Sequence, residues 1–170
     1  MAGIFFRKLI SHIVLGVCLL LVTKWVLAGT ETLSYQHHTI DIKGKQYQVR
    51  VPLGYVLEVV TTELDRPRLM TFATNGDLII GSKSGNVYRL EPPYTQLQVL
   101  IKLDDYPHSV ALRNNEIFIA QNKGLYRAPY RAGQDKINKK ELTRLAPLPG
   151  GSGHSSRTVG VGPDGRIYLS

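Results

Sequence analysis

The fold is decided by residues 69–90, which read LMTFATNGDLIIGSKSGNVYRL. An apolar run is followed by a Thr-Asn-Gly turn and a strongly apolar second run. A second polar turn, Lys-Ser-Gly, precedes a third run that ends in Tyr-Arg. Because alternate side chains of a strand point to opposite faces of a sheet, this pattern predicts three consecutive strands joined by tight turns.

The same unit occurs twice more along the chain. Residues 109–130 read SVALRNNEIFIAQNKGLYRAPY, and residues 158–170 read TVGVGPDGRIYLS. A repeat of about 40–50 residues with about four short strands is the signature of a β-propeller blade. The fourth strand is expected between the copies, for example at residues 98–101. The sequence therefore predicts an all-β chain that contains about the first two to three blades of a propeller.

Propellers close with about four to eight blades, so a chain with this few is expected to be the N-terminal part of a larger propeller, or a truncated product. A region of short strands, residues 29–55, precedes the repeats, which occupy residues 56–170. We predict a hairpin around Lys43-Gly44-Lys45 and a further strand over residues 56–60. Only residues 133–142 are a plausible short helix.

The N-terminus has the three-part plan of a secretory signal peptide. Arg7 and Lys8 precede an apolar run over residues 13–22, and small residues at the end of Val26-Leu27-Ala28 fit a cleavage site. The alternative is that residues 9–28 remain as an anchor in an inner membrane. Either reading predicts an exported protein, in the periplasm or outside the cell, whose only membrane contact is this segment.

Charge and cysteine content exclude several classes of protein. The net charge is +8, and cleavage of residues 1–28 would lower it to +5, because three basic residues and no acidic residue are lost. These charges are scattered, whereas a nucleic-acid site needs a dense basic patch. The only cysteine, Cys18, lies in the leader, so the rest of the chain has no disulfide, cysteine metal site or cysteine nucleophile.

Two adjoining stretches carry a family resemblance. Residues 150–158 (GGSGHSSRT) and 162–170 (GPDGRIYLS) resemble the glucose/sorbosone dehydrogenase family of soluble quinoproteins. Residues 66–72 (RPRLMTF) and 106–112 (YPHSVAL) are similar to two further stretches of its opening blades. The resemblance implies a six-bladed propeller that uses pyrroloquinoline quinone and calcium to oxidise a sugar or aldose.

The resemblance also implies roles for individual residues. His154 matches the family's general base, which removes the substrate hydroxyl proton while hydride passes to the quinone C5 carbon. Arg157 is either a structural tie between the loop and the neighbouring blade or a cofactor-binding residue. His108 follows a proline at the start of an inner strand, so it is either an ordinary strand-end histidine or a channel-facing contact to cofactor or substrate.

Other candidate residues are given structural interpretations. His37 and His38 would point to opposite faces of a strand, which makes them a poor metal pair, and Asp104-Asp105 are expected in a turn. We assign no metal ligand, because the family's calcium ligands come from later blades. The alternatives are a non-catalytic exported propeller that binds a ligand or partner protein, with His154 as a loop residue, or an inactive truncated product.

Overall fold

The computed structural model describes residues 32–151, 153 and 156–170. Twelve β-strands and one short 3₁₀ turn make up the regular structure of these residues, without an α-helix. The all-β prediction is therefore confirmed. No helix in the described ranges is long and apolar enough to cross a membrane, and the predicted leader lies outside them.

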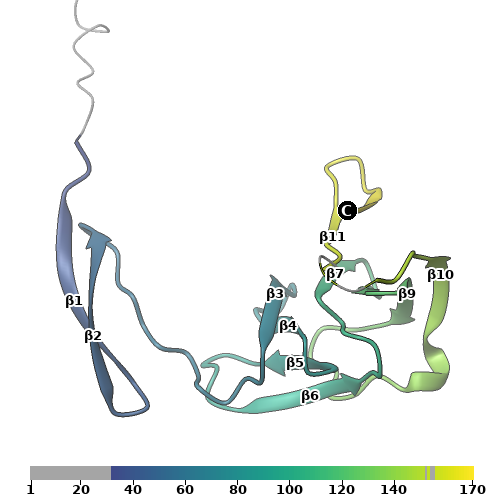
Figure 1. The fold of residues 1–170 in the computed structure, drawn as a ribbon, viewed down its shortest axis with the longest axis horizontal. Coiled ribbons are helices and arrows are strands. Elements are labelled where there is room, and N and C mark those ends of the chain that lie inside the picture. The colour runs from purple at the N-terminus through teal and green to yellow at the C-terminus, as the bar shows by residue number, and fades with distance from the viewer. Residues whose placement is uncertain (1–31, 152, 154–155) are drawn as a thin grey trace, which may run out of the picture. The chain divides into compact units, whose positions relative to one another are not determined.

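The first blade is a four-stranded antiparallel sheet whose strands follow one another in chain order (Figure 1). Its strands are β3 (Pro67–Phe72), β4 (Leu78–Ser82), β5 (Asn86–Leu90) and β6 (Leu97–Lys102). Gly76 and Gly85 occupy turn positions with φ values of 89° and 94°, which side chains with a Cβ disfavour. The fourth strand confirms the prediction made for residues 98–101.

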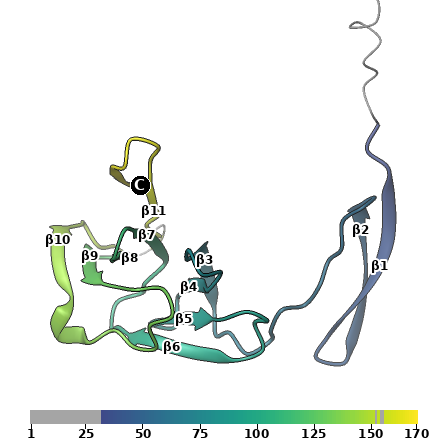
Figure 2. The same ribbon diagram turned by 180° about the vertical axis from the view of Figure 1, so that it is seen from behind.

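The second blade repeats this order with β7 (Ser109–Arg113), β8 (Glu116–Gln121), β9 (Gly124–Pro129) and β10 (Thr143–Pro147). Figure 2 shows β10 beside β9, with which it pairs from Thr143 to Pro147. The helix predicted over residues 133–142 is wrong apart from the 3₁₀ turn Lys139–Glu141, which Asn138 and Glu141 cap reciprocally. The rest of this segment is an irregular connection between β9 and β10.

The third repeat contributes a two-stranded hairpin, β11 (Val159–Val161) and β12 (Ile167–Leu169). Gly165 has a φ of 74° in the turn between them. Strand β11 lies beside β7 of the second blade. The described residues thus form two four-stranded blades and the first hairpin of a third, which is a partial β-propeller.

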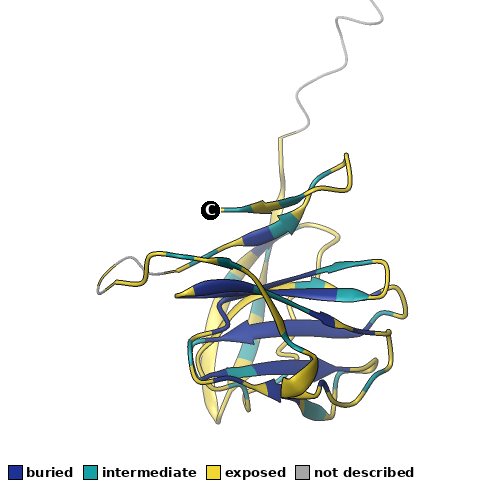
Figure 3. Ribbon diagram, turned by 90° about the vertical axis from the view of Figure 1, so that its right-hand side faces the viewer, coloured by how far each residue is buried: buried dark blue, intermediate teal, exposed yellow. Residues whose placement is uncertain are grey.

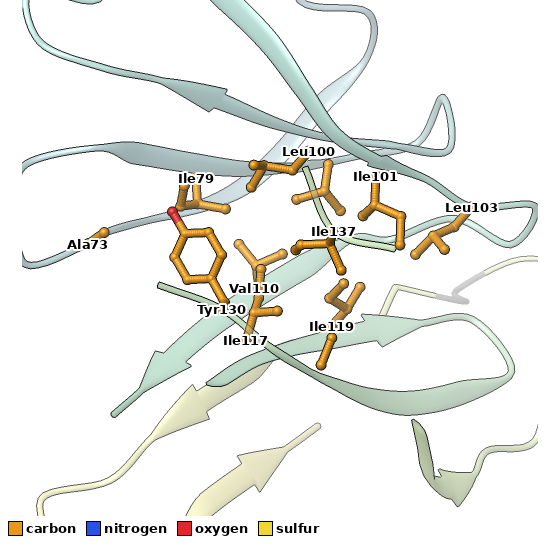
Figure 4. Close-up of a cluster of buried hydrophobic side chains, with 12 residues drawn as sticks. Ala73, Ile79, Leu100, Ile101, Leu103, Val110, Ile117, Ile119, Tyr130 and Ile137 are labelled. Carbon is orange, nitrogen blue, oxygen red and sulfur yellow. The ribbon is translucent and has the colours of Figure 1, made fainter. Parts of the chain in front are cut away.

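The main hydrophobic core lies between the first two blades. Ile79 and Val87 of the first blade and Ile117 and Ile119 of the second are fully excluded from solvent. Figure 4 shows Ile79, Ile117 and Ile119 between the two sheets, with Tyr130 and Ala73 at one end of the cluster and Leu103 at the other. Complete burial of such a side chain stabilises a fold by about 1.5–3 kcal/mol, so each blade depends on its neighbour.

The other face of the second blade packs against the third. Val159, Ile167 and Leu169 contact a cluster that includes Phe118 and Leu125. Figure 3 shows burial concentrated in the inner parts of the two four-stranded sheets, whereas β3, β10 and most connecting loops are exposed. Along β8, Ile117 and Ile119 belong to the core between the first two blades, whereas Phe118 and Ala120 belong to the cluster that meets the third repeat, so alternate side chains enter two buried faces.

The N-terminal hairpin consists of β1 (Tyr35–Ile42) and β2 (Lys45–Pro52), as predicted. Lys43 and Gly44 in its turn both have positive φ, at 53° and 78°, which matches the twist of the strands that they join. The strand predicted over residues 56–60 is wrong. This segment is irregular and exposed, and no described strand pairs with it to satisfy its backbone groups.

Candidate functional site

One cavity lies where the inner strands of the three blades begin. It has a volume of about 340 Å³ and is lined by Pro67, Arg68, Leu69, His108, Ser156, Arg157 and Thr158. Arg68, His108 and Arg157 occupy equivalent positions of the repeat, since each precedes the aligned residues Met70, Val110 and Val159 by two. Adjacent inner strands β3, β7 and β11 bring these three positions together.

His108 is the most deeply buried polar group of this cavity. Its side chain is held among packed residues with only 3% of the residue exposed. Its backbone N–H donates to the Ala120 carbonyl at 3.0 Å, and its carbonyl accepts from the Leu69 N–H at 3.1 Å. Neither imidazole nitrogen has a hydrogen-bond partner among the described residues. A buried polar group without a partner is unusual and points to a ligand or a bound water.

The surroundings keep His108 neutral. Burial lowers the pKa of its imidazole below the ordinary 6.5, and the positive charges of Arg68 and Lys83 lower it further, while Asp105 opposes them. A neutral imidazole has one donor and one acceptor nitrogen, so it can both give and receive a hydrogen bond. His108 is therefore suited to a ligand that carries polar groups.

Arg157 lines the cavity and is bonded to a neighbouring loop. Its Nη2 donates to the Pro149 carbonyl at 2.6 Å, in the loop that follows β10. Its Nε is buried without a partner in the described part of the chain. The side chain is thus tied to the loop that follows β10, while the residue also lines the cavity.

Arg68 is a cavity residue that reasoning from the sequence did not assign. It is exposed at the start of β3 and lines the same cavity as His108. The repeat register was the signal that could have found it, because position 68 of the first repeat corresponds to 108 and 157 in the next two. With Lys83, whose amine lies 5.9 Å from the centroid of the Tyr106 ring, it makes this end of the blades cationic.

Gly81 allows the first blade to approach the segment that carries His108. A Cβ at this position would lie 2.5 Å from the Pro107 carbonyl oxygen and 2.8 Å from the His108 carbonyl carbon. Directly afterwards, the Ser82 N–H donates to the Pro107 carbonyl at 2.7 Å. The position of His108 is therefore fixed by backbone contacts from β3, β4 and β8.

His154, the predicted base, lies outside the described residues, and its role remains a prediction. No group of three or more histidine, cysteine, aspartate or glutamate side chains that could hold a metal ion occurs within the described ranges. Asp105 is a loop residue whose Oδ2 accepts the Lys123 N–H at 2.7 Å.

No protein-family model matches this chain, and no curated protein matches it. Solved structures do. The holo form of the pyranose dehydrogenase PQQ domain from Coprinopsis cinerea matches with a TM-score of 0.59 and 17% identity, over 81% of this chain and 32% of that one. A calcium structure of a Trichoderma reesei carbohydrate-active enzyme of family AA12 matches with a TM-score of 0.54 and 16% identity, over 78% and 31%.

An iodide structure of the same Trichoderma reesei family also matches, with a TM-score of 0.51 and 17% identity. The chain spans about a third of the length of these structures. The likeness confirms the propeller fold, and it agrees with the predicted resemblance at the level of a PQQ-domain fold. Membership of the glucose/sorbosone family itself stays a prediction.

Proposed function

We propose that this chain forms the first blades of an exported quinoprotein sugar oxidoreductase, whose cofactor binds at the cationic cavity. The observation that carries the proposal is the meeting of Arg68, His108 and Arg157 at one end of the inner strands. Pyrroloquinoline quinone, when bound, supplies a quinone that accepts two electrons, and it also carries carboxylates. The fold shared with a PQQ domain supports the same choice.

The residues present fit such an anionic group. Guanidinium groups bind carboxylates through paired, charge-assisted hydrogen bonds, and Arg68 and Arg157 both line the cavity. The imidazole of His108 and the Nε of Arg157 lie buried beside this cavity without a partner among the described residues. We assign to these three side chains the binding and orientation of the anion.

We assign the proton chemistry to His154. A histidine titrates near neutral pH, so a neutral imidazole can accept the proton of a sugar hydroxyl. The residue belongs to the loop that leads into Ser156 and Arg157, both of which line the cavity. Calcium, a sugar or aldose substrate and export through residues 1–28 complete the proposal for the whole protein.

Binding of the cofactor tests this proposal directly. The purified chain is titrated with pyrroloquinoline quinone, with and without calcium, by isothermal titration calorimetry. Arg68→Gln and Arg157→Gln should each weaken binding about tenfold or more, since each removes a charge-assisted hydrogen bond. Arg66→Gln is the matched control, because Arg66 pairs with Asp65 and does not line the cavity. Absence of saturable binding, or equal affinities in all variants, contradicts the proposal.

A non-catalytic, ligand-binding propeller is the second candidate function. The cationic lining alone favours it, because the same side chains would bind any small organic carboxylate. The two functions separate in the whole protein supplied with pyrroloquinoline quinone, calcium and an aldose. Reduction of an artificial dye that is lost on His154→Ala supports the oxidoreductase, whereas carboxylate binding without dye reduction supports the second function.

A further inference from the structure

The first blade exposes a position that the next two repeats bury. Val110 is 4% exposed and belongs to the core between the first two blades, and Val159 is 5% exposed and belongs to the cluster that joins the third repeat to the second blade. Met70, the equivalent residue of the first repeat, is 58% exposed. Because this position faces the preceding blade in the second and third repeats, the first blade presents a face that a further blade could cover.

This face of the first blade is apolar across all four strands. Met70 pairs with Ile80, Ile80 with Tyr88, and Tyr88 with Val99, and residues directly opposite each other lie on the same face of a sheet. Ile80 and Tyr88 in the centre are buried, whereas Val99 and Phe72 at the margins are 42% and 63% exposed. Exposed apolar residues that gather on one face indicate a surface for contact with another protein segment.

The third repeat contributes two strands within the described residues, whereas each of the two blades before it has four. Thr158 and Ser170 exchange both backbone hydrogen bonds, at 3.2 and 3.0 Å. Since the N–H and C=O groups of a strand alternate in direction, those of Ile167 and Leu169 point away from β11. No other described strand pairs with this edge of β12, so the edge can accept a further strand.

The N-terminal hairpin also consists of two strands. Figure 1 shows β1 beside β2, and neither pairs with a further strand among the described residues. The two-residue turn at 43–44 sets the register, which the bond from the Leu53 N–H to the Ser34 carbonyl continues at 2.7 Å. In this register the Thr39 N–H points to the outer edge of β1 and the Gln48 N–H to the outer edge of β2. Because a lone two-stranded hairpin is at best marginally stable in water, we expect this one to join another sheet.

The two faces of the hairpin differ in polarity. Ile40 and Val49 lie on one face, whereas Thr39 and Gln48, whose side chains bond each other at 2.7 Å, lie on the other. When the outer edge of β1 pairs with the outer edge of β12, the outward-pointing residues of the two strands lie opposite each other. The apolar face of the hairpin then falls on the same side of the joined sheet as Tyr168, which is 55% exposed.

We propose that two copies of this chain exchange their N-terminal hairpins, so that β1 of one copy pairs with β12 of the other and a four-stranded blade β11-β12-β1-β2 results. Tyr168 of this composite blade covers Met70 of the copy that supplies the hairpin. Two blades from each copy and two composite blades make a ring of six, within the range of about four to eight that closes a propeller. Exchange of an identical element is a low-cost route to a symmetric dimer. The inference does not rest on the proposed cofactor.

The oligomeric state of the purified chain tests this pairing. Light scattering should give twice the chain mass, and hydrogen exchange should be slow at the Ile167 and Leu169 amides, which β1 would bind. Thr39→Pro removes the N–H at the pairing edge of β1 and should raise the dimer dissociation constant about tenfold or more in sedimentation equilibrium. Gln48→Pro is the matched control, because it loses the same side-chain bond but removes an N–H from the outermost edge of β2. It should leave the dimer intact.

A second pair of variants probes the exposed face of the first blade. Met70→Glu places a charge opposite Tyr168 and should also dissociate the dimer, while circular dichroism stays that of a folded chain, because Met70 is exposed in the single copy. Leu145→Glu is the matched control, since Leu145 is 44% exposed in β10, away from the proposed contact. Every variant keeps the N-terminal segment, so that segment cannot account for a difference between them.

Several outcomes would overturn the proposal. A chain that stays monomeric or forms only larger assemblies contradicts it, and so do equal dissociation constants within either pair of variants. Slow exchange of Ile167 and Leu169 in a monomer would mean that another segment occupies the edge of β12. Rapid exchange of these amides in a dimer would mean that the copies meet elsewhere. None of these readouts needs quinone, so this proposal and the proposed function can fail separately.

Discussion

The Nε of Arg89 lies 2.6 Å from Oδ2 of Asp77, and the two side chains are only 4% and 1% exposed. Asp77 precedes β4 and Arg89 lies in β5, so both belong to the first blade. The Gly133 N–H donates to the same Oδ2 at 3.0 Å, and Arg89 Nη1 donates to Asp135 at 3.0 Å. This buried ion pair therefore fastens the connection of the second blade to the first blade.

Removal of one partner of this pair should destabilise the protein strongly. Arg89→Met leaves the Asp77 carboxylate buried without its counter-ion, for which we expect a loss of about 3–5 kcal/mol in the free energy of unfolding. Urea denaturation followed by circular dichroism measures it. Arg127→Met is the control, because Arg127 forms a half-buried pair with Glu116 near the surface, and its loss should cost about 0–1 kcal/mol. Equal effects of the two substitutions would refute the structural role of the buried pair.

The Asp77 carboxylate should make the folded protein less stable at acid pH. Burial alone would raise the pKa of Asp77, but hydrogen bonds from Arg89, Asn75 and Gly133 outweigh it and hold the pKa below the ordinary 3.8. A carboxylate with a lowered pKa stabilises the fold above its unfolded pKa of about 3.9, and this stabilisation is lost as pH falls through the folded pKa. Unfolding free energies measured from pH 6 to pH 2 should show the loss, and Asp77→Asn should flatten it.

The charge of Arg68 should be visible in the titration of His108. Burial is the first cause of the lowered His108 pKa and Arg68 is the second, so Arg68→Gln should raise this pKa towards 6.5. A histidine whose pKa falls on folding stabilises the fold fully above about pH 6.5, and that contribution decreases as pH falls towards the folded pKa. NMR of the imidazole C–H groups measures the midpoint. An unchanged midpoint in Arg68→Gln, or an equal change in Arg66→Gln, would contradict the placement of the Arg68 charge near His108.

Substitution of Gly81 should displace the backbone that carries His108 and so alter the cationic cavity. In Gly81→Ala the added Cβ would meet backbone atoms of Pro107 and His108, which cannot move as a flexible side chain can. We expect a loss of about 1–3 kcal/mol in stability and a changed His108 NMR signal. Gly160→Ala is the matched control, since a Cβ there would meet no atom within 4 Å. A Gly81→Ala protein with unaltered stability and an unaltered His108 signal would show that Gly81 does not lie against the backbone of Pro107 and His108.

Ser109 should hold the third repeat against the second blade. Its hydroxyl donates to the Val159 carbonyl at 3.3 Å and accepts from the Val159 N–H at 3.1 Å, in a buried setting. Ser109→Ala leaves both backbone groups without this partner, for which we expect a loss of about 1–3 kcal/mol. Amide hydrogen exchange should speed up in β11 and β12 while β4 and β8 stay protected. Unchanged protection of Val159 would rule out this coupling.

The sequence alone predicted most of the strands of the blades. Alternation of apolar residues, together with turn glycines such as Gly76, Gly85 and Gly165, is a local signal that depends on few distant contacts. The spacing from Met70 to Val110 and Val159 also carried the repeat register, and with it the equivalence of positions 68, 108 and 157. The predicted roles of His108, Arg157 and His154 remain to be tested by the experiments above.

Only the tertiary structure decided which of these signals become strands and sites. Residues 56–60 are an apolar run like that of a strand but have no described partner strand, whereas residues 143–147 become β10 because β9 offers its edge. The burial of His108 depends on contacts with Leu69 and Ala120 in other strands. Burial, pKa shifts and cavities arise from residues that are distant in sequence and close in space, so local patterns determine the strands and packing between the blades determines the sites.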